Sequence, residues 1–270
     1  MLGRMDAEPD EVRIAEVTSH AGRVAAADLL AEIWGLAPSE SPFPADLMTA
    51  LQHAGGCVLA AVTPDDHTVG VTVGLAGGPR STSVYSYVAG VAPSFAGRGL
   101  GRRLKIAQRD WALERGADTL TWTYDPLIRR NGYFNLNRLG ARATQFVPDY
   151  YPPMLDAVNQ GDLPDRFVIE WLLDEEPGGR GLPPGSDAAP VVLAEHSGAS
   201  AVRLAGVDLA AAGVVRAWIP SDIEALRARD AGRGRAWRLA AREVFTAVFE
   251  AGFVAVGVDS GGHYVFAREA

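Results

Sequence analysis

The stretch that decides the fold is Val88-Ala-Gly-Val-Ala-Pro-Ser-Phe-Ala-Gly-Arg-Gly-Leu-Gly-Arg-Arg-Leu-Lys105. It has the pattern of a strand end, a glycine-rich turn and a helix start. A helix start leaves backbone N–H groups without an intrahelical acceptor and carries the positive end of the helix dipole. Glycines let the backbone approach a bulky anion closely. The turn contains Gly97, Gly99 and Gly101, and the nearby arginines are Arg98, Arg102 and Arg103.

This pattern predicts a cradle for a pyrophosphate group at the helix start. A tight turn in which the glycines serve backbone geometry alone is the alternative. Among other phosphate-binding sites, a dinucleotide-binding turn has the most similar sequence pattern. The spacing here is G-x-G-x-G, however, whereas that turn needs G-x-G-x-x-G, and the preceding strand comes late in the chain.

The segments on either side of the cradle alternate between strand and helix patterns. Before it, we expect a short strand over 12–17, helices over 20–35 and 44–52, a strand hairpin over 57–63 and 68–76, and a strand over 82–91. From the cradle onward, we expect a helix over 99–114, a strand over 118–124, a helical segment over 125–139, and strands over 143–147 and 167–173.

The sequence also predicts a division into domains. Residues 1–10 read as a flexible tail, 11–173 as the domain that holds the cradle, and 174–190 as a linker without periodicity. Residues 191–270 read as a small α+β domain with strands over 191–194, 201–204 and 214–219 and a closing hairpin over 253–258 and 263–267. Its helical stretch over 221–252 is expected to start with Ser221 as N-cap and to break near 232–234.

Composition excludes several classes of protein. The 270 residues carry a formal net charge of −8, which is not the footprint of a nucleic-acid binder. No apolar run is long enough to cross a membrane, and the first ten residues lack the order of a signal peptide. With Cys57 as the single cysteine, we expect no disulfide and a cytoplasmic protein. No cluster of residues has metal-ligand spacing.

The segment Val91-Ala-Pro-Ser-Phe-Ala-Gly-Arg-Gly-Leu-Gly101 resembles the cofactor motif of GNAT acetyltransferases, V-x-P-x-[YF]-R-G-x-G-[IL]-G. Ala96 departs from it, since arginine or glutamine is usual there, but the backbone cradle is kept. The expected order of elements is similar to that family over residues 11–173. The resemblance implies an α+β fold with a mixed, mostly antiparallel central sheet flanked by helices.

The resemblance also implies an activity. Such a protein transfers an acyl group, most often acetyl, from acetyl-CoA or another short acyl-CoA to an amine by direct attack in a ternary complex. The acceptor would be a small-molecule or protein amine. The implied cofactor-binding residues are Ala89, Gly90, Val91, Ala96, Gly97, Arg98, Gly99, Leu100, Gly101, Arg102, Asn131, Phe134 and Asn135. Asn131 and Asn135 could equally cap local turns.

The usual general acid of the family is a tyrosine within the pattern L-Y-x-K-L-G-F, and Leu136 stands at that position here. Tyr133 lies three residues earlier on nearly the same helical face and could donate the proton, or it could pack in the core. Tyr124, at the end of a strand beside the expected cleft, is a second catalytic candidate. The missing tyrosine leaves an alternative function: an acyl-CoA-binding module without turnover, in a sensor or regulatory role.

A narrower resemblance links several segments to a little-characterised group of long predicted GNAT proteins. They are Ser86-Tyr87, Leu104 to Arg109, Asp125-Pro-Leu, Asn131 to Gly140, Asp165-Arg166, Glu170-Trp171 and Trp237 to Arg242. Residues 191–270 could complete the acceptor cleft, form a homodimer surface or be a diverged second GNAT-like unit. Arg233, Arg235, Arg238 and Arg242 are expected to form a solvated helix face.

Overall fold

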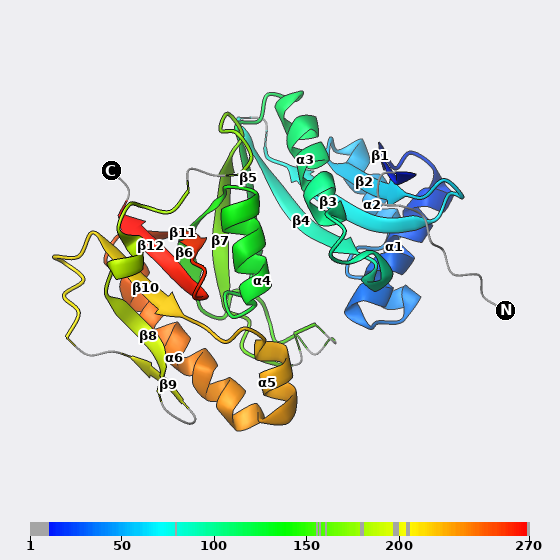
Figure 1. Ribbon diagram of the computed structural model, residues 1–270. Coiled ribbons are helices and arrows are strands. Elements are labelled where there is room, and N and C mark those ends of the chain that lie inside the picture. The colour runs from blue at the N-terminus through cyan, green and yellow to red at the C-terminus, as the bar shows by residue number, and fades with distance from the viewer. Residues whose placement is uncertain are drawn as a thin grey trace. The chain divides into compact units, whose positions relative to one another are not determined.

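The computed structural model of the protein describes residues 11–78, 80–154, 156, 158–159, 161–178, 181–196, 200–203 and 206–268. The expected tail over residues 1–10 lies outside this part. The chain forms two compact units, which Figure 1 shows in colours that follow the sequence. Unit 1 consists of residues 1–121 with 155–160, and unit 2 of residues 122–154 with 161–270.

Unit 1 builds one part of the expected sheet. Its elements are β1 (Arg13–Glu16), α1 (His20–Trp34), η2 (Pro38–Glu40), α2 (Ala45–His53), β2 (Cys57–Val62), β3 (Thr68–Ala76), β4 (Ser83–Val91), η3 (Pro93–Phe95), α3 (Leu100–Leu113) and the first half of β5 (Thr119–Tyr124). The strands lie in the order β1-β2-β3-β4-β5. All neighbours are antiparallel except β4 and β5, which are parallel.

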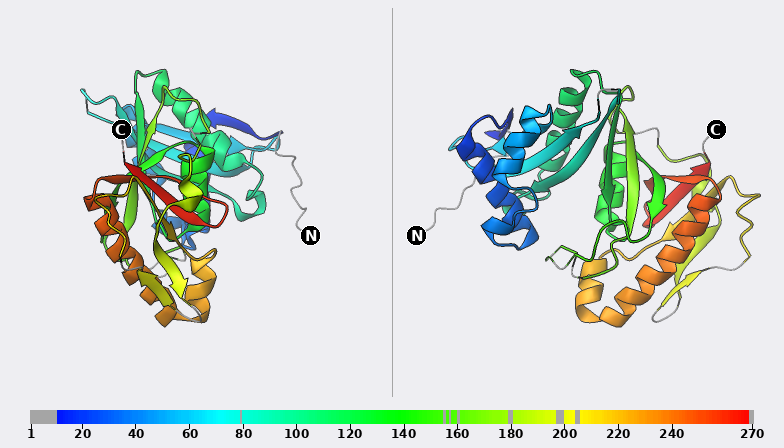
Figure 2. Two further views of the ribbon diagram at one scale, coloured as in Figure 1. Left: turned by 60° about the vertical axis from the view of Figure 1, so that its left-hand side comes forward. Right: turned by 180° about the vertical axis from the view of Figure 1, so that it is seen from behind.

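Helices α1 and α3 cover opposite faces of this sheet, as Figure 2 shows. A Cβ built on Gly90 would meet the side chain of Ile33 in α1, whereas one built on Gly70 would meet that of Leu104 in α3. Alternate positions of a strand point to opposite faces, which gives each helix its own apolar surface. Glycine at both strand positions therefore lets the two helices pack close to the sheet.

Unit 2 continues the chain from the second half of β5. Its elements are α4 (Arg129–Gly132), the π-helix η4 (Tyr133–Arg138), β6 (Arg142–Val147), β7 (Arg166–Leu172), η5 (Ser186–Ala188), β8 (Val191–His196), β9 (Ser200–Arg203), β10 (Val214–Trp218), α5 (Ile223–Arg229), α6 (Ala231–Glu250), β11 (Phe253–Val258) and β12 (His263–Arg268). The strand order is β5-β7-β6-β11-β12-β10-β8-β9. The mixed, mostly antiparallel sheet with flanking helices confirms the expected fold class.

An aromatic core joins α6 to the strands of unit 2. The ring of Phe167 in β7 lies 5.0 Å from that of Phe245 in α6 and 5.3 Å from that of Tyr264 in β12. Trp237 and Phe253 are also fully buried. The aromatic residues of the C-terminal part therefore form a core that includes a strand from before residue 174.

The division between the units does not fall at 174–190. Strand β11 pairs with β6 through Ala255 and Ala143, so residues 191–270 extend the sheet that β6 and β7 begin. The backbone N–H of Gly178 also donates to the carbonyl of Leu139 at 3.2 Å. Whether residues 11–173 and 191–270 fold separately stays a prediction.

Two expected helix boundaries in the C-terminal part are wrong. Asp222, not Ser221, is the N-cap of α5, and its carboxylate accepts from the N–H of Ala225 at 2.8 Å. The helical stretch breaks at Asp230, not at 232–234, because that carboxylate accepts from the N–H of Arg233 at 2.9 Å and starts α6. An aspartate at the N-cap satisfies a donor that the helix leaves open, and this outweighs the flexibility of the two glycines.

Across the described residues, none of the helices combines the length and the apolar character that a membrane span needs.

Candidate functional site

The expected cradle lies within unit 1, between the end of β4 and the start of α3. Gly97 and Gly99 both have φ of +77°, a backbone conformation that other residues adopt at a cost. Nothing lies within 4 Å of a Cβ built on either of them. The glycines therefore serve the turn itself and also leave open space beside it.

The first turn of α3 offers unsatisfied donors. Gly99 is its N-cap and supplies no side-chain hydrogen bond. Within the described residues, the first N–H groups of the helix that find an acceptor are those of Arg102 and Arg103, which both donate to the carbonyl of Gly99. The N–H groups of Leu100 and Gly101 precede them and are available to an anion.

The three arginines around the cradle have different surroundings. Arg98 is exposed, with its guanidinium carbon 5.2 Å from the centre of the Phe95 ring. Arg102 is exposed as well. Arg103 donates to the carbonyl of Val12 at 2.5 Å and so ties α3 to the chain before β1. The positive charge beside the turn therefore comes mainly from Arg98 and Arg102.

Strand β4 leaves part of one edge without a strand partner. Its pairing with β5 runs from Ser83 to Tyr85, opposite Thr119 to Thr121. Its pairing with β3 continues to Val91 but shifts register where Val73 and Gly74 face Val88 and Ser86. Tyr87 is the extra residue of this bulge, which bends the strand. The N–H of Ala92 donates to the carbonyl of Val69 in β3, so the alternate residue Gly90 also faces β3. Within unit 1 as described, the backbone groups of Ala89 and Val91 point to the β5 side of β4, beyond the pairing with β5.

A buried lysine connects the cradle helix with the bulge. The Nζ of Lys105 in α3 donates to the Oγ of Ser86 in β4 at 2.6 Å. The lysine is 5% exposed and Ser86 is 3% exposed. Burial lowers the pKa of Lys105 to about 7, against a small opposing influence of Cys57. Both residues belong to segments of the narrower resemblance, Ser86-Tyr87 and Leu104 to Arg109, but the helix pattern alone does not single out Lys105.

The candidate acid Tyr133 lies in unit 2, in the π-helix η4. It is 45% exposed, and the guanidinium carbon of Arg138 lies 5.6 Å from its ring centre. Leu136, at the position of the family's tyrosine, is buried. Phe134 and Asn131 are half-buried. Among these residues, Tyr133 is the one that is exposed.

Asn135 and Tyr124 face the interior of unit 2. The Oδ1 of Asn135 accepts from the indole N–H of Trp122 at 3.2 Å, and the residue is buried. The buried hydroxyl of Tyr124 donates to that of Tyr264 at 3.2 Å, and Tyr264 in turn donates to the carbonyl of Pro126. Burial raises the pKa of Tyr124 well above its usual value. Both side chains are occupied in holding the fold.

A buried ionic network begins directly after β5. The Oδ1 of Asp125 accepts from the N–H of Leu127, while its Oδ2 accepts from Arg238 at 2.6 Å. Arg238 is 1% exposed and also donates to Asp162 at 2.8 Å. Arg227 contacts both aspartates. The expectation of a solvated arginine face on α6 is therefore wrong for Arg238.

The network extends along α6 to Arg242. Its guanidinium donates to Asp165 at 3.0 Å and to Asp149 at 2.8 Å. The segments that carry the narrower resemblance, around Asp125, Asp165 and Arg238, therefore meet in space. The sequence does not predict this ionic network, because its residues lie far apart in the chain. The narrower resemblance nevertheless includes the segments from which they come.

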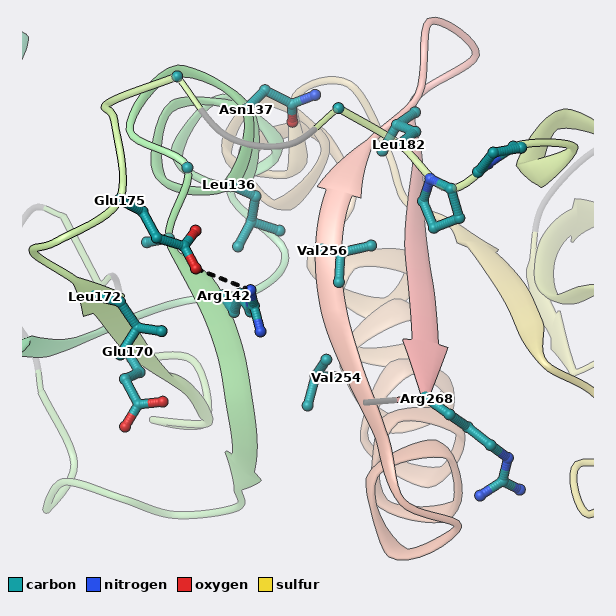
Figure 3. Close-up of a pocket in the computed structure, with 16 residues that line it drawn as sticks. Leu136, Asn137, Arg142, Glu170, Leu172, Glu175, Leu182, Val254, Val256 and Arg268 are labelled. Carbon is teal, nitrogen blue, oxygen red and sulfur yellow. Dashed lines mark hydrogen bonds and ion pairs between the residues drawn. The ribbon is translucent and has the colours of Figure 1, made fainter. Parts of the chain in front are cut away.

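Unit 2 also contains a cavity of about 730 Å³, drawn in Figure 3. Leu172 and Glu170 of β7 line one side and Val254 and Val256 of β11 the other, with Leu182 covering it. Arg142 and Glu175, which form an ion pair of 3.3 Å, also line it. The cradle residues do not line this cavity.

A model of a known protein family matches the segment that contains the cradle. Residues 8–133 match the family model described as the acetyltransferase (GNAT) domain. This segment contains β4, the glycine turn and α3, and it ends at Tyr133. A comparison with curated proteins found no match. Residues 8–133, somewhat less than half of the chain, therefore resemble a GNAT acetyltransferase domain.

Two solved structures are among those similar in fold. The ribosomal-protein-S18-alanine N-acetyltransferase from Escherichia coli is 17% identical, with 64% of this chain and 99% of that chain covered and a TM-score of 0.46. An acetyltransferase from Bacillus subtilis, solved in complex with CoA, is 20% identical, with 60% and 98% covered and a TM-score of 0.45. At these levels of similarity neither an acceptor nor a mechanism carries over to this chain.

Proposed function

We propose that the protein transfers an acyl group, in the first place acetyl, from acyl-CoA to a small-molecule or protein amine. The observation that carries this proposal is the cradle: two glycines with left-handed φ, the open N–H groups of Leu100 and Gly101, and the exposed Arg98 and Arg102. These groups fit a pyrophosphate, because they offer donors, positive charge and the space that a Cβ on Gly99 would fill.

The residues that would hold the cofactor fall into two sets. Gly97, Gly99 and Leu100 belong to the cradle, together with Ala96, Arg98, Gly101 and Arg102. The segment Ala89, Gly90 and Val91 of β4 would bind the pantetheine, with the backbone groups of Ala89 and Val91 on the open side. Asn131, Phe134 and Asn135 complete the proposed set, with Asn135 limited to its amide N–H₂ group because Trp122 occupies its Oδ1.

Acetyl-CoA supplies the acetyl group as a thioester. The chain would contribute positioning, which is a large part of the rate in such reactions, and an N–H of β4 near Gly90 or Val91 to stabilise the oxyanion. Tyr133 would donate the proton at its phenolic oxygen, since its hydroxyl is exposed. The buried Tyr124 is less suited to this role, because its hydroxyl already donates to Tyr264.

A second candidate function is acyl-CoA binding without turnover. The buried Leu136 at the family's tyrosine position favours it. Release of thiol from acetyl-CoA in the presence of a panel of amines distinguishes the two functions. We expect release that depends on both the protein and an amine. Binding of acetyl-CoA without release for any amine would support the second function, and an absence of binding would contradict both.

A further inference from the structure

Asn137 ties the π-helix η4 to the C-terminal part of unit 2. Its Nδ2 donates to the carbonyl of Val258 at 3.1 Å, and its Oδ1 accepts from the N–H of the same residue at 2.9 Å. Val258 is the last residue of β11, beyond the point where Ala255 pairs with Ala143 of β6. The amide of Asn137 therefore takes the place of a neighbouring strand there, and Figure 3 shows the side chain close to this end of β11.

The segment that Asn137 holds has an uncommon conformation. Hydrogen bonds in a π-helix join residues five apart, as the N–H of Leu139 does with the carbonyl of Phe134 at 3.0 Å. The N–H of Ala141, which follows the turn, donates to the carbonyl of Asn135 at 3.1 Å. Single π-helical turns are rare and are often found at functional sites. Asn137 adds the tie that fixes this turn to a strand from a distant part of the chain.

The five-residue spacing decides which side chain lies over Tyr133. Residues three or four apart share a face of an α-helix, whereas a π-helix joins residues five apart. Arg138 lies five residues after Tyr133, and its guanidinium carbon is 5.6 Å from the centre of the tyrosine ring. A cation at this distance from an aromatic ring is attracted to it. Loss of the π-helical turn would therefore separate Arg138 from the ring and reorient Tyr133.

We propose that Asn137 is a positioning residue for Tyr133: by holding the π-helical turn on β11, it keeps the phenolic oxygen in the orientation for proton transfer. The inference rests on the proposed function, in which Tyr133 is the proton donor. As the amine nitrogen bonds to the acyl carbon, the C–S bond breaks and its electron pair leaves with sulfur. The oxygen of Tyr133 gives its proton to that sulfur, the amine nitrogen loses a proton to solvent, and the phenolate regains one from solvent.

Arg268 of β12 makes a comparable tie that serves as a control. Its guanidinium donates to the carbonyls of Ala251 at 2.6 Å, Leu209 at 2.8 Å and Ala212 at 3.3 Å. Like Asn137, it joins a side chain to backbone groups of unit 2, but these partners lie outside η4. Arg268→Met should therefore weaken the fold without moving Tyr133.

A double-mutant cycle tests the link between Asn137 and Tyr133. The four proteins are the wild type, Asn137→Ala, Tyr133→Phe and the double variant, and thiol release from acetyl-CoA with a saturating amine gives kcat. We expect Asn137→Ala to lower kcat about tenfold or more, because a small misplacement of a reacting group is costly, with the Kd of acetyl-CoA nearly unchanged. In the Tyr133→Phe background, the same change should lower kcat by less than about twofold. Arg268→Met should keep kcat within about twofold in either background.

Fluorine NMR follows Tyr133 without turnover. The seven tyrosines of the chain are replaced by 3-fluorotyrosine, and the resonance that is missing in Tyr133→Phe belongs to Tyr133. We expect Asn137→Ala and Arg138→Met to shift this resonance, and Arg268→Met to leave it in place. If Asn137→Ala does not fold, Asn137→Asp takes its place, since it loses the donor to the carbonyl of Val258 but keeps the acceptor for its N–H.

An unmoved Tyr133 resonance in a folded Asn137 variant would overturn the inference. Equal losses of kcat in both backgrounds would also overturn it, because the effect of Asn137 would then not pass through Tyr133. Full activity of Tyr133→Phe would do the same but would leave acyl transfer as the function. Binding of acetyl-CoA without thiol release by the wild type, for any amine, contradicts the proposed transfer, and the inference falls with it.

Discussion

Arg238 in α6 donates a hydrogen bond to Asp125, the residue that directly follows β5, over 2.6 Å. The two residues are 113 positions apart in the sequence. The guanidinium is 1% exposed and shares its donors with Asp162. The C-terminal part of the chain thus holds the residue at which β5 ends.

Replacement of Arg238 by alanine should therefore destabilise the protein strongly. Asp125 and Asp162 would remain buried without their main compensating charge, which typically costs about 3–5 kcal/mol. Chemical denaturation followed by circular dichroism measures the change in the free energy of unfolding. Arg13→Ala serves as a control, because its ion pair with Asp66 is exposed and should contribute at most about 1 kcal/mol. A loss below about 1 kcal/mol for Arg238→Ala would show that the network is not buried as described.

Lys105→Met should stabilise the protein, and the gain should depend on pH. The pKa of Lys105 falls from 10.5 in the unfolded chain to about 7 in the folded one. Below pH 7 both states bind the proton and the burial cost is complete, whereas between pH 7 and 10.5 the folded state releases it and the cost declines. We expect the free energy of unfolding of Lys105→Met to exceed that of the wild type by at least about 1.4 kcal/mol at pH 6. The difference between the two proteins should be smaller at pH 9. Chemical denaturation at pH 6 and at pH 9 measures this difference in the free energy of unfolding. The same difference at both pH values would argue against a shifted pKa of Lys105.

A fragment that ends at residue 190 should not form the native unit 2. It would expose the edge of β6 that pairs with β11 and the surface of Phe167 that Phe245 covers. Loss of buried aromatic packing should leave that region without slow amide exchange. Hydrogen exchange on the fragment and on the full chain tests this. Native protection of β6 and β7 in the fragment would instead support a separate domain over residues 11–173.

Tyr133→Phe should lower kcat by roughly 10²-fold, the scale typical of general acid catalysis, with the affinity for acetyl-CoA nearly unchanged. The ring is kept and only the exposed hydroxyl is lost. Tyr150→Phe is the matched control, since Tyr150 is 38% exposed and its ring packs against Tyr151. Steady-state thiol release provides the rate. Full activity of Tyr133→Phe assigns the proton to water or another donor, and a simultaneous loss of acetyl-CoA binding assigns the hydroxyl to binding.

The cradle could be predicted from the sequence because all of its determinants are local. Gly97, Gly99 and the helix start lie within a few residues, and their conformation follows from the absence of Cβ atoms and from unsatisfied N–H groups. The strands of the sheet followed from their apolar runs. The bulge at Tyr87 did not, since it depends on the register between β3 and β4.

The rest of the site depends on residues that are distant in the sequence. The arginine pattern of α6 suggests a solvated face when read alone, and only the fold brings Arg238 to Asp125. The same holds for Ala255 of β11 beside Ala143 of β6, which ties the C-terminal part to the earlier sheet. The burial of Lys105 against Ser86 likewise needs the packing of α3 on β4, which periodicity gives only as an apolar face.

The most direct test of the cradle is calorimetric titration of acetyl-CoA into three proteins: the wild type, Gly99→Asp and Gly116→Asp. The two glycines have nearly equal φ, +77° and +76°, with nothing within 4 Å of a Cβ, but Gly116 lies beyond the C-terminal end of α3. Aspartate tolerates this conformation better than most residues, so the backbone cost is matched, whereas only Asp at 99 brings negative charge to the phosphates. We predict binding to the wild type and to Gly116→Asp, and at least a hundredfold weaker binding to Gly99→Asp. Equal binding to all three proteins, or none to the wild type, would contradict the account.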